Sequence, residues 1–259
     1  AGHNIDEVNG QATLTDEQLS FRLQSLRLND LPLVASGQIN DFKKFILDCE
    51  VETNHGSLEA ITKAFPQTKQ LDLHGLVDGK LSIKGPLANI TATGTATINN
   101  GQFYKQPFTS QADIVYEQQK LNISLHQATL LQGSASGTGH VDFISPTPKL
   151  SLNLTFQKIN LATLAQNSSG IEGLAAGNLQ LAGPVNNLRG ELQSAFAKTK
   201  ILGQSVDHLS AAFVAKDSEV FLNKFLVSSA NAAFNANGQI SRDLVFDFQA
   251  NAQGINLAG

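Results

Sequence analysis

The sequence predicts an all-β protein of repeating antiparallel strands, with one or two short helices between repeats. Three observations support this fold class. Long stretches alternate polar and apolar residues with a period of two, which is the pattern of strands with one solvated face. A glycine-proline stretch that begins at Gly75 recurs 98 residues later at Gly173. Only two segments have helical spacing, too few to supply the crossover helices of a parallel sheet.

The repeat is clearest between residues 75–89 and 173–187, which share the pattern Gly-Leu-x-x-Gly-x-Leu-x-(Ile/Leu)-x-Gly-Pro-x-x-Asn. A period of this length indicates quasi-equivalent units that share one core. We expect the second half of a unit over 4–70, a complete unit over 71–168, and a third, truncated unit over 169–259. The glycines of the blocks are expected to set bends and turns. Because the chain contains no Met, we expect a piece of a longer protein.

The first half-unit contains two alternating segments, one around Leu19 to Leu23 and one from Phe45 to Val51. Residues 57–65 then have helical spacing, with Ser57 as a candidate N-cap and Pro66 as the stop.

The complete unit predicts strands over 90–98, 112–116, 121–125, 133–143 and 150–156, followed by a second short helix over 159–164. Asn99-Asn100-Gly101 is a hairpin signal, because Asn and Gly tolerate the positive φ of tight turns.

The three copies can be overlaid with their apolar phase preserved. Leu19 matches Leu121 and Val220, and the series continues through Phe21, Ile123 and Leu222, then Phe45, Leu150 and Phe246, then Leu47, Leu152 and Phe248, then Cys49, Leu154 and Ala250, and then Val51, Phe156 and Ala252. The same face is therefore expected to be apolar in each copy.

The apolar face must be covered in one of two ways. A second sheet about 10 Å away would give a sandwich or barrel with an ordinary protein core. Alternatively, a curled sheet would leave a concave apolar face for its own side walls or for an apolar ligand. The continuous phase along the repeat favours the curled sheet, and so does the lack of helices to cover about 16 strands.

The two glycine-proline blocks and their continuations over 90–98 and 188–196 resemble the TamB proteins of the AsmA-like, bridge-like lipid-transfer superfamily. The resemblance covers most of residues 70–259. It implies a U-shaped antiparallel sheet, or β-taco, with a groove that shields phospholipid acyl chains between the inner and outer membranes. It also implies a periplasmic protein of a Gram-negative-type envelope, with an N-terminal inner-membrane anchor and a BamA-type outer-membrane barrel as partner, both held by parts outside this chain.

The expected groove lining consists of the apolar positions that stay in phase. They are Leu19, Phe21, Phe45, Leu47, Val51, Leu81, Ile83, Leu121, Ile123, Leu150, Leu152, Leu154, Phe156, Leu179, Leu181, Val220, Leu222, Phe246 and Phe248. Two alternatives are kept: a periplasmic scaffold or chaperone for outer-membrane protein assembly that binds strands by β-augmentation, and a structural β-solenoid spacer.

Other chemistry is not predicted. The six histidines lack metal-ligand spacing, and Cys49 falls at an apolar strand position, which favours a structural thiol over a nucleophile. A net charge of −4 without a basic patch argues against a nucleic-acid partner. We therefore expect no enzyme activity, no metal and no cofactor.

Overall fold

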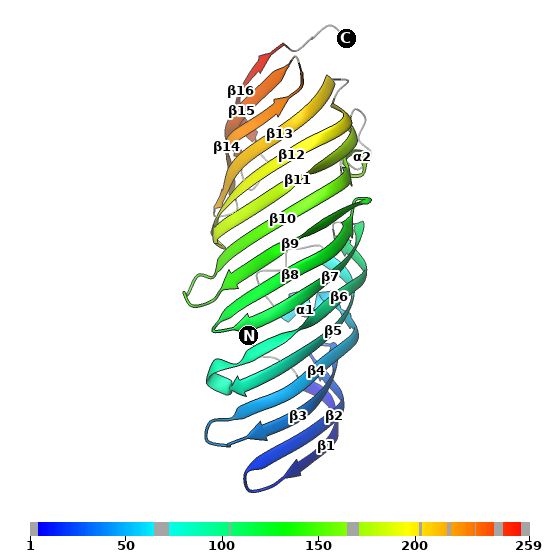
Figure 1. Cartoon of the computed structure of the whole chain (residues 1–259), viewed down its shortest axis with the longest axis vertical. Coiled ribbons are helices and arrows are strands. Elements are labelled where there is room, and N and C mark those ends of the chain that lie inside the picture. Colours follow the sequence, from blue (N-terminus) through cyan, green and yellow to red (C-terminus); the bar gives the residue numbers. More distant parts are fainter. Residues whose placement is uncertain are drawn as a thin grey trace. The chain divides into compact units, whose positions relative to one another are not determined.

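The computed structural model describes residues 5–64, 73–103, 105–164, 171–201, 204–216, 219–230, 232–240 and 246–254. Within these ranges the chain forms sixteen strands, two short α-helices and one 3-10 turn. Hydrogen-bonded neighbours follow chain order from β1 to β16 (Figure 1). The registers given below are all antiparallel, so the predicted all-β class with few helices is confirmed.

The chain divides into two compact units, Ala1–Ala128 (unit 1) and Thr129–Gly259 (unit 2). The division falls inside β8 (Lys120–Leu130). The repeat boundaries expected at 70/71 and 168/169 follow the period of the sequence instead, and they remain a prediction.

The described residues of unit 1 form seven complete strands, one helix, one 3-10 turn and most of β8. These elements are β1 (Ile5–Leu14), β2 (Gln18–Leu28), β3 (Leu31–Asn40), β4 (Ile46–Ser57), α1 (Leu58–Ala64), β5 (Leu73–Pro86), η2 (Leu87–Asn89), β6 (Thr91–Phe103) and β7 (Gln106–Glu117). The N–H of Ala60 donates to the Ser57 hydroxyl at 3.3 Å, which confirms Ser57 as the cap of α1. The predicted stop at Pro66 lies outside the described residues.

Unit 2 continues with β9 (Gly133–Asp142), β10 (Lys149–Asn160), α2 (Leu161–Leu164), β11 (Ile171–Pro184), β12 (Asn187–Ile201), β13 (Gln204–Lys216), β14 (Glu219–Ser228), β15 (Ala233–Ile240) and β16 (Phe246–Gln253). Helix α2 begins two residues later than predicted. The reason is Asn160, whose Oδ1 accepts from the N–H groups of Ala162 at 3.0 Å and Thr163 at 3.2 Å. Asn160 is therefore the cap of α2, and Ile159 belongs to the strand before it.

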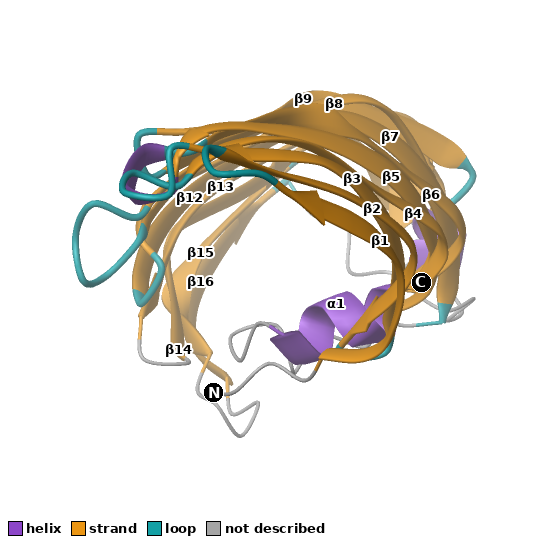
Figure 2. Cartoon of the chain, turned by 90° about the horizontal axis from the view of Figure 1, so that it is seen from below, coloured by secondary structure: helices purple, strands orange, loops and turns teal. Residues whose placement is uncertain are grey.

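β-Bulges interrupt the strands of each unit at equivalent places. Register shifts lie between Thr53 and Gly56 in β4 and between Phe156 and Ile159 in β10. The extra residue in each bulge has positive φ, 56° at His55 and 55° at Lys158. Because a bulge bends its strand and increases the local twist, these sites contribute to the bend that strands of each unit show along their length (Figure 2).

The hairpin predicted at Asn99-Asn100-Gly101 is wrong, because these residues form another bulge. They lie inside β6, where the register with β7 shifts between Ile98 and Gly101, and Asn100 has a φ of 52°. Asn does adopt the positive φ that the prediction relied on, but the bulge needs it as much as a turn would. The chain reverses only after Phe103.

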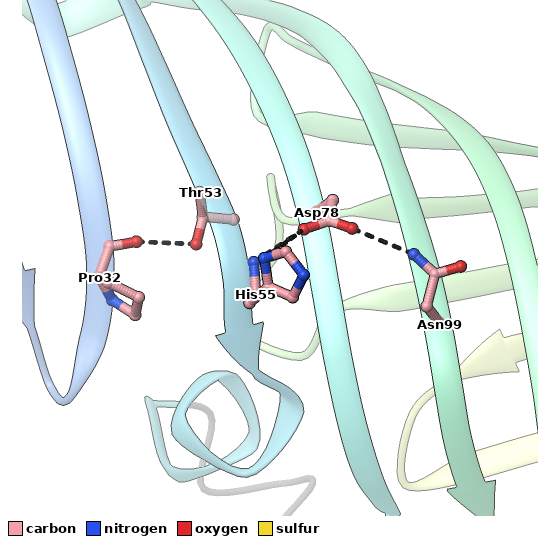
Figure 3. A network of polar contacts seen from close by, with 5 residues as sticks. All are labelled: Pro32, Thr53, His55, Asp78 and Asn99. Atoms are coloured by element: carbon pink, nitrogen blue, oxygen red, sulfur yellow. Dashed lines mark hydrogen bonds and ion pairs between the residues drawn. The ribbon is translucent and has the colours of Figure 1, made fainter.

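A small polar network joins four strands beside the bulge of β4 (Figure 3). The backbone N–H of His55 donates to Asp78 Oδ1 at 2.7 Å, and the Asn99 amide donates to Asp78 Oδ2 at 3.0 Å. The Thr53 hydroxyl donates to the carbonyl of Pro32 at 2.7 Å. The His55 backbone hydrogen bond, helped by the charge of His55 and by Asn99, holds the pKa of Asp78 below its usual value. The carboxylate is thus kept ionised where it fixes the bulge.

The recurring Gly-Pro pair forms a corner at the end of β5 and of β11. Gly85 and Gly183 have φ values of 102° and 128°, which residues with a side chain rarely adopt. A Cβ added at Gly183 would lie 2.7 Å from the carbonyl oxygen of Asn187. The residue after each proline donates its N–H to the preceding hairpin, Leu87 to Phe45 at 3.1 Å and Val185 to Pro148 at 3.0 Å. These glycines therefore have the structural role that we expected.

The same corners correct the overlay of the copies. Leu47 pairs with Gly85, whereas Leu150 pairs with Gly183. Leu47 is therefore the counterpart of Leu150, and the first copy was overlaid two residues out of register. Phe45, predicted at the start of the strand, lies in the turn before β4 with a φ of 48° and a side chain that is 47% exposed. A two-residue slip keeps every side chain on its face, so alternation alone does not detect it.

Candidate functional site: an apolar sheet face

Strand pairing in unit 1 gathers the apolar residues into rows on one face of the sheet. One row contains Phe21, Gly37, Cys49, Ile83, Ala92 and Tyr116, and the next contains Leu23, Ala35, Val51, Leu81, Gly94 and Ile114. The row between them, on the opposite face, contains Arg22, Ser36, Glu50, Ser82 and Thr93. We call the face that carries the two apolar rows the apolar face, and the face that carries the row of Arg22 the polar face.

Exposed ion pairs occupy the polar face of unit 1. Lys80 Nζ lies 2.9 Å from Glu50 and 2.8 Å from Glu52, and hydrogen bonds to Glu52 and Glu50 raise the pKa of Lys80. His126 Nε2 of β8 lies 2.7 Å from Asp113 of β7. Such exposed pairs add little stability, but they keep this face solvated. Because His126 lies on the polar face and side chains alternate along a strand, Leu121 and Ile123, which are an odd number of residues from His126, lie on the apolar face.

Unit 2 repeats the arrangement over β9 to β16. One row contains Gly139, Leu152, Leu181, Gly190, Phe213, Leu222 and Gly238, and pairing extends it to Phe248. The next contains Gly137, Leu154, Leu179, Leu192, Ala211, Phe225 and Ala236. The side chains of Phe246 and Phe248 lie outside the described part of the structure.

No second protein layer covers these rows within the described residues. No side chain there is fully buried, and the buried apolar residues are few and mostly small, such as Ala35 and Ala211. The expected lining residues with described side chains are half-buried, apart from the exposed Phe45. Half-burial without a covering layer indicates that these side chains shield one another on an open face.

A cavity opens on the apolar face of unit 2, in the corner beside α2. Its volume is about 330 Å³, and only apolar atoms line it. The residues around it are Leu130, Leu131, Ala135, Leu154, Phe156, Ile159, Leu161, Ala175, Leu179, Leu192, Ser194, Phe196 and Leu209. Leu131, Ile159 and Ala175 form a small buried cluster at its edge. We name this the α2 cavity.

Sequence reasoning predicted only part of this cavity. Leu154, Phe156 and Leu179 were expected on the apolar face, whereas Leu131, Ile159 and Ala175 were not. Leu192 and Phe196 carried a usable signal, because they are spaced by an even number of residues in one alternating strand. Leu131 carried none, since it lies in the turn between β8 and β9.

Helix α1 occupies the equivalent corner of unit 1, on the concave side of the sheet (Figure 2). Leu58 and Ala60 of α1 are buried, and so is Val77 of β5. His74 Nδ1 lies 2.6 Å from Glu59 Oε1 and ties the helix to β5. Partial burial raises the pKa of Glu59, but hydrogen bonds from Ser57, its own N–H and His74 outweigh this effect and leave the pKa below its usual value.

The polar residues of the described part offer little chemistry beyond these contacts. They contain no group of three His, Cys, Asp or Glu side chains placed to hold a metal ion. The Cys49 thiol is buried on the apolar face, and its pKa is raised by burial and then by the charge of Asp48, so the thiol stays protonated. The described helices are all too short or too polar to cross a membrane.

Comparison with known proteins gives one match. Residues 32–195, more than half of the chain, match the family model described as the TamB C-terminal domain. The match includes both glycine-proline blocks, all of β4 to β11 and most of β3 and β12. Neither the curated proteins nor the solved structures contain a match to this chain.

Proposed function

This chain belongs to the TamB family, and from that premise we propose that its apolar face shields phospholipid acyl chains that pass between two membranes. The family is one of bacterial envelope bridges and translocation modules. In our proposal the chain works in the periplasm. Other parts of the protein supply the inner-membrane anchor and the contact with a BamA-type outer-membrane barrel.

The observation that carries the proposal is the uncovered apolar face of each unit. Large exposed apolar patches are rare on soluble proteins and mark interaction sites. An acyl chain loses about 0.8 kcal/mol of favourable burial for each CH₂ group that enters water. A continuous apolar face removes most of that cost along the path of the lipid.

The composition of the rows suits movement better than tight binding. The two rows described for unit 1 carry Leu, Ile, Val, Phe, Ala and Gly with one Cys and one Tyr, and no charged residue. Hydrocarbon held by such a face makes no directional contact, so it can slide from row to row. A charged head group finds no partner in these rows and would remain in water at the mouth of the groove.

The competing functions have weaker support. A scaffold that binds strands by β-augmentation needs free backbone groups, whereas strands between β1 and β16 already have a neighbour on both sides. A spacer with a protein-filled core needs large buried side chains, and the described residues contain no fully buried one.

Mass spectrometry of the purified chain tests the proposal. We expect phospholipid to co-purify with the chain, and a soluble β-protein of similar size, prepared in parallel, to carry none. A lipid content no higher than that of the control protein would refute the proposed function.

A further inference from the structure

We propose that the α2 cavity is a discrete resting site for the methyl end of one acyl chain. This inference rests on the proposed function and adds to it. Lipid would not occupy the apolar face of unit 2 evenly, but would pause in the corner beside α2.

The α2 cavity is a built feature of the fold. Phe156 and Ile159 flank the bulge of β10, and Leu161 opens the helix that follows. Leu131 reaches the corner from the turn between β8 and β9, and its carbonyl accepts the N–H of Asn160 at 3.0 Å. The bulge, the turn and the capped helix thus place apolar side chains on several sides of one hollow.

The chemistry of the corner selects hydrocarbon. The Ser194 hydroxyl donates to the carbonyl of Ala176 at 3.1 Å. The Asn160 side chain donates to Gln132 at 2.9 Å and caps α2 with its oxygen. A peptide segment in the cavity would find no partner for its N–H and C=O groups, which is costly. An acyl chain needs no such partner.

The volume fits one chain rather than a whole lipid. A cavity of about 150 Å³ takes benzene, with six carbon atoms. The α2 cavity, at about 330 Å³, therefore takes on the order of a dozen carbon atoms by the same scale. That is most of one common acyl chain, and the rest of the lipid would lie along the open face.

The matching corner of unit 1 carries different side chains. The two units can be aligned on the pairs Leu47/Gly85 and Leu150/Gly183. In this alignment Thr53 corresponds to Phe156, and Val77 corresponds to Ala175. Leu58, at the start of α1, is only 5% exposed, whereas Leu161, at the start of α2, is half-buried. Within the described residues α1 has seven residues and α2 has four. We therefore place the resting site in unit 2, where the cavity lies.

A cavity-filling substitution tests the resting site. Ala135 lines the cavity opposite Phe156, so Ala135→Phe fills part of it. The matched control is Ala96→Phe, on the apolar face of unit 1 opposite Gly79. The measurement is the Kd for cis-parinaric acid, a fluorescent fatty acid, with thermal unfolding of each variant. If the ring displaces about two methylene groups, Ala135→Phe weakens binding by about tenfold, whereas Ala96→Phe, on the open apolar face where the acyl chain can lie elsewhere, weakens it by a clearly smaller factor.

Each outcome of this experiment decides something. Equal effects of the two substitutions would overturn the resting site, while binding by the unmodified chain would leave the proposed function intact. Failure of the unmodified chain to bind would overturn both. If Ala135→Phe does not fold, the unmodified chain is photo-crosslinked to a fatty acid that carries a diazirine at its methyl end, and the adducts are mapped. We expect adducts on β10 and α2, and adducts spread evenly over β9 to β16 would overturn the inference.

Discussion

Replacing Leu152 with aspartate puts a charge in the middle of the apolar face of unit 2. Leu152 pairs with Gly139 on one side and with Leu181 on the other, and its side chain is half-buried. We expect Leu152→Asp to leave the chain folded and to weaken its binding of phospholipid. A packed core and a lipid-binding face respond differently to this change, which is why the substitution is informative.

The two effects have different sizes. Full burial of a leucine stabilises a protein by about 1.5–3 kcal/mol, so a half-buried leucine contributes roughly 1 kcal/mol. Its loss lowers Tm by about 2–4 °C in a chain of this length. In the complex with lipid, the aspartate carboxylate stays hydrated, so two or three methylene groups of the acyl chain are no longer buried, at about 0.8 kcal/mol each. The total of about 2 kcal/mol corresponds to roughly 30-fold in Kd.

The control is Asn153→Asp, which adds the same charge one residue further along the strand. Asn153 is exposed on the polar face, so this variant should bind lipid and unfold like the unmodified chain. The assay is titration with a fluorescent phospholipid analogue, and thermal unfolding is measured on the same samples.

Two results would refute this reasoning. Equal Kd values for Leu152→Asp and Asn153→Asp would mean that lipid does not contact the apolar face. A fall in Tm of more than about 10 °C for Leu152→Asp alone would mean that Leu152 is part of a closed core, because burying a charge there costs several kcal/mol.

Three further predictions concern the frame that shapes this face. Gly85→Ala should destabilise the chain by about 1–3 kcal/mol in urea unfolding, since Gly85 has a φ of 102°; Gly79→Ala in the same strand should be near neutral, because an added Cβ meets nothing closer than 3.4 Å. The pKa of Asp78 is lower in the folded chain than in the unfolded chain, so Asp78 stabilises the fold above the unfolded pKa of about 3.9, and this effect is lost as pH falls through the folded pKa. Asp78→Asn should therefore make the free energy of unfolding less dependent on pH in this acidic range. An unchanged pH dependence would contradict the role of the network. Asn160→Ala removes the cap of α2 and should lower the free energy of unfolding by about 1 kcal/mol, with faster amide exchange in the helix. Asn160→Ser keeps a capping side chain and should retain most of that stability.

The sequence allowed the apolar face to be predicted because side-chain direction has a fixed period in a strand. Leu81 and Ile83 alternate with Ser82 and lie on one face, and Leu179 and Leu181 repeat the pattern. Nothing beyond the period of two was needed to assign these positions.

Register was harder to predict, because it depends on turns as well as on alternation. A slip of two residues along a strand preserves the face, so the overlay of Phe45 with Leu150 looked sound. The slip is revealed by strand pairing, because Leu47 pairs with Gly85 whereas Leu150 pairs with Gly183. The Asn99-Asn100-Gly101 segment failed for a related reason, since a bulge and a tight turn both require positive φ.

The α2 cavity as a hollow could not be predicted from the sequence, although some of the residues around it were expected on the apolar face. Leu131, Ile159 and Ala175 belong to a turn, a strand end and the next strand, and they meet only after the sheet has formed. Each residue is ordinary in its own segment. The bulge between Phe156 and Ile159 and the start of α2 at Leu161 bring these residues together.

Photo-crosslinking in the full-length protein in living cells tests most directly whether lipid travels on the apolar face. A crosslinking residue replaces Leu81 or Leu179 on the apolar face, and in the controls it replaces the neighbouring Ser82 or Gln180 on the polar face. We predict phospholipid adducts at the two leucine positions and none at the two controls. Adducts to protein alone, or equal lipid labelling of the two faces, would contradict the account.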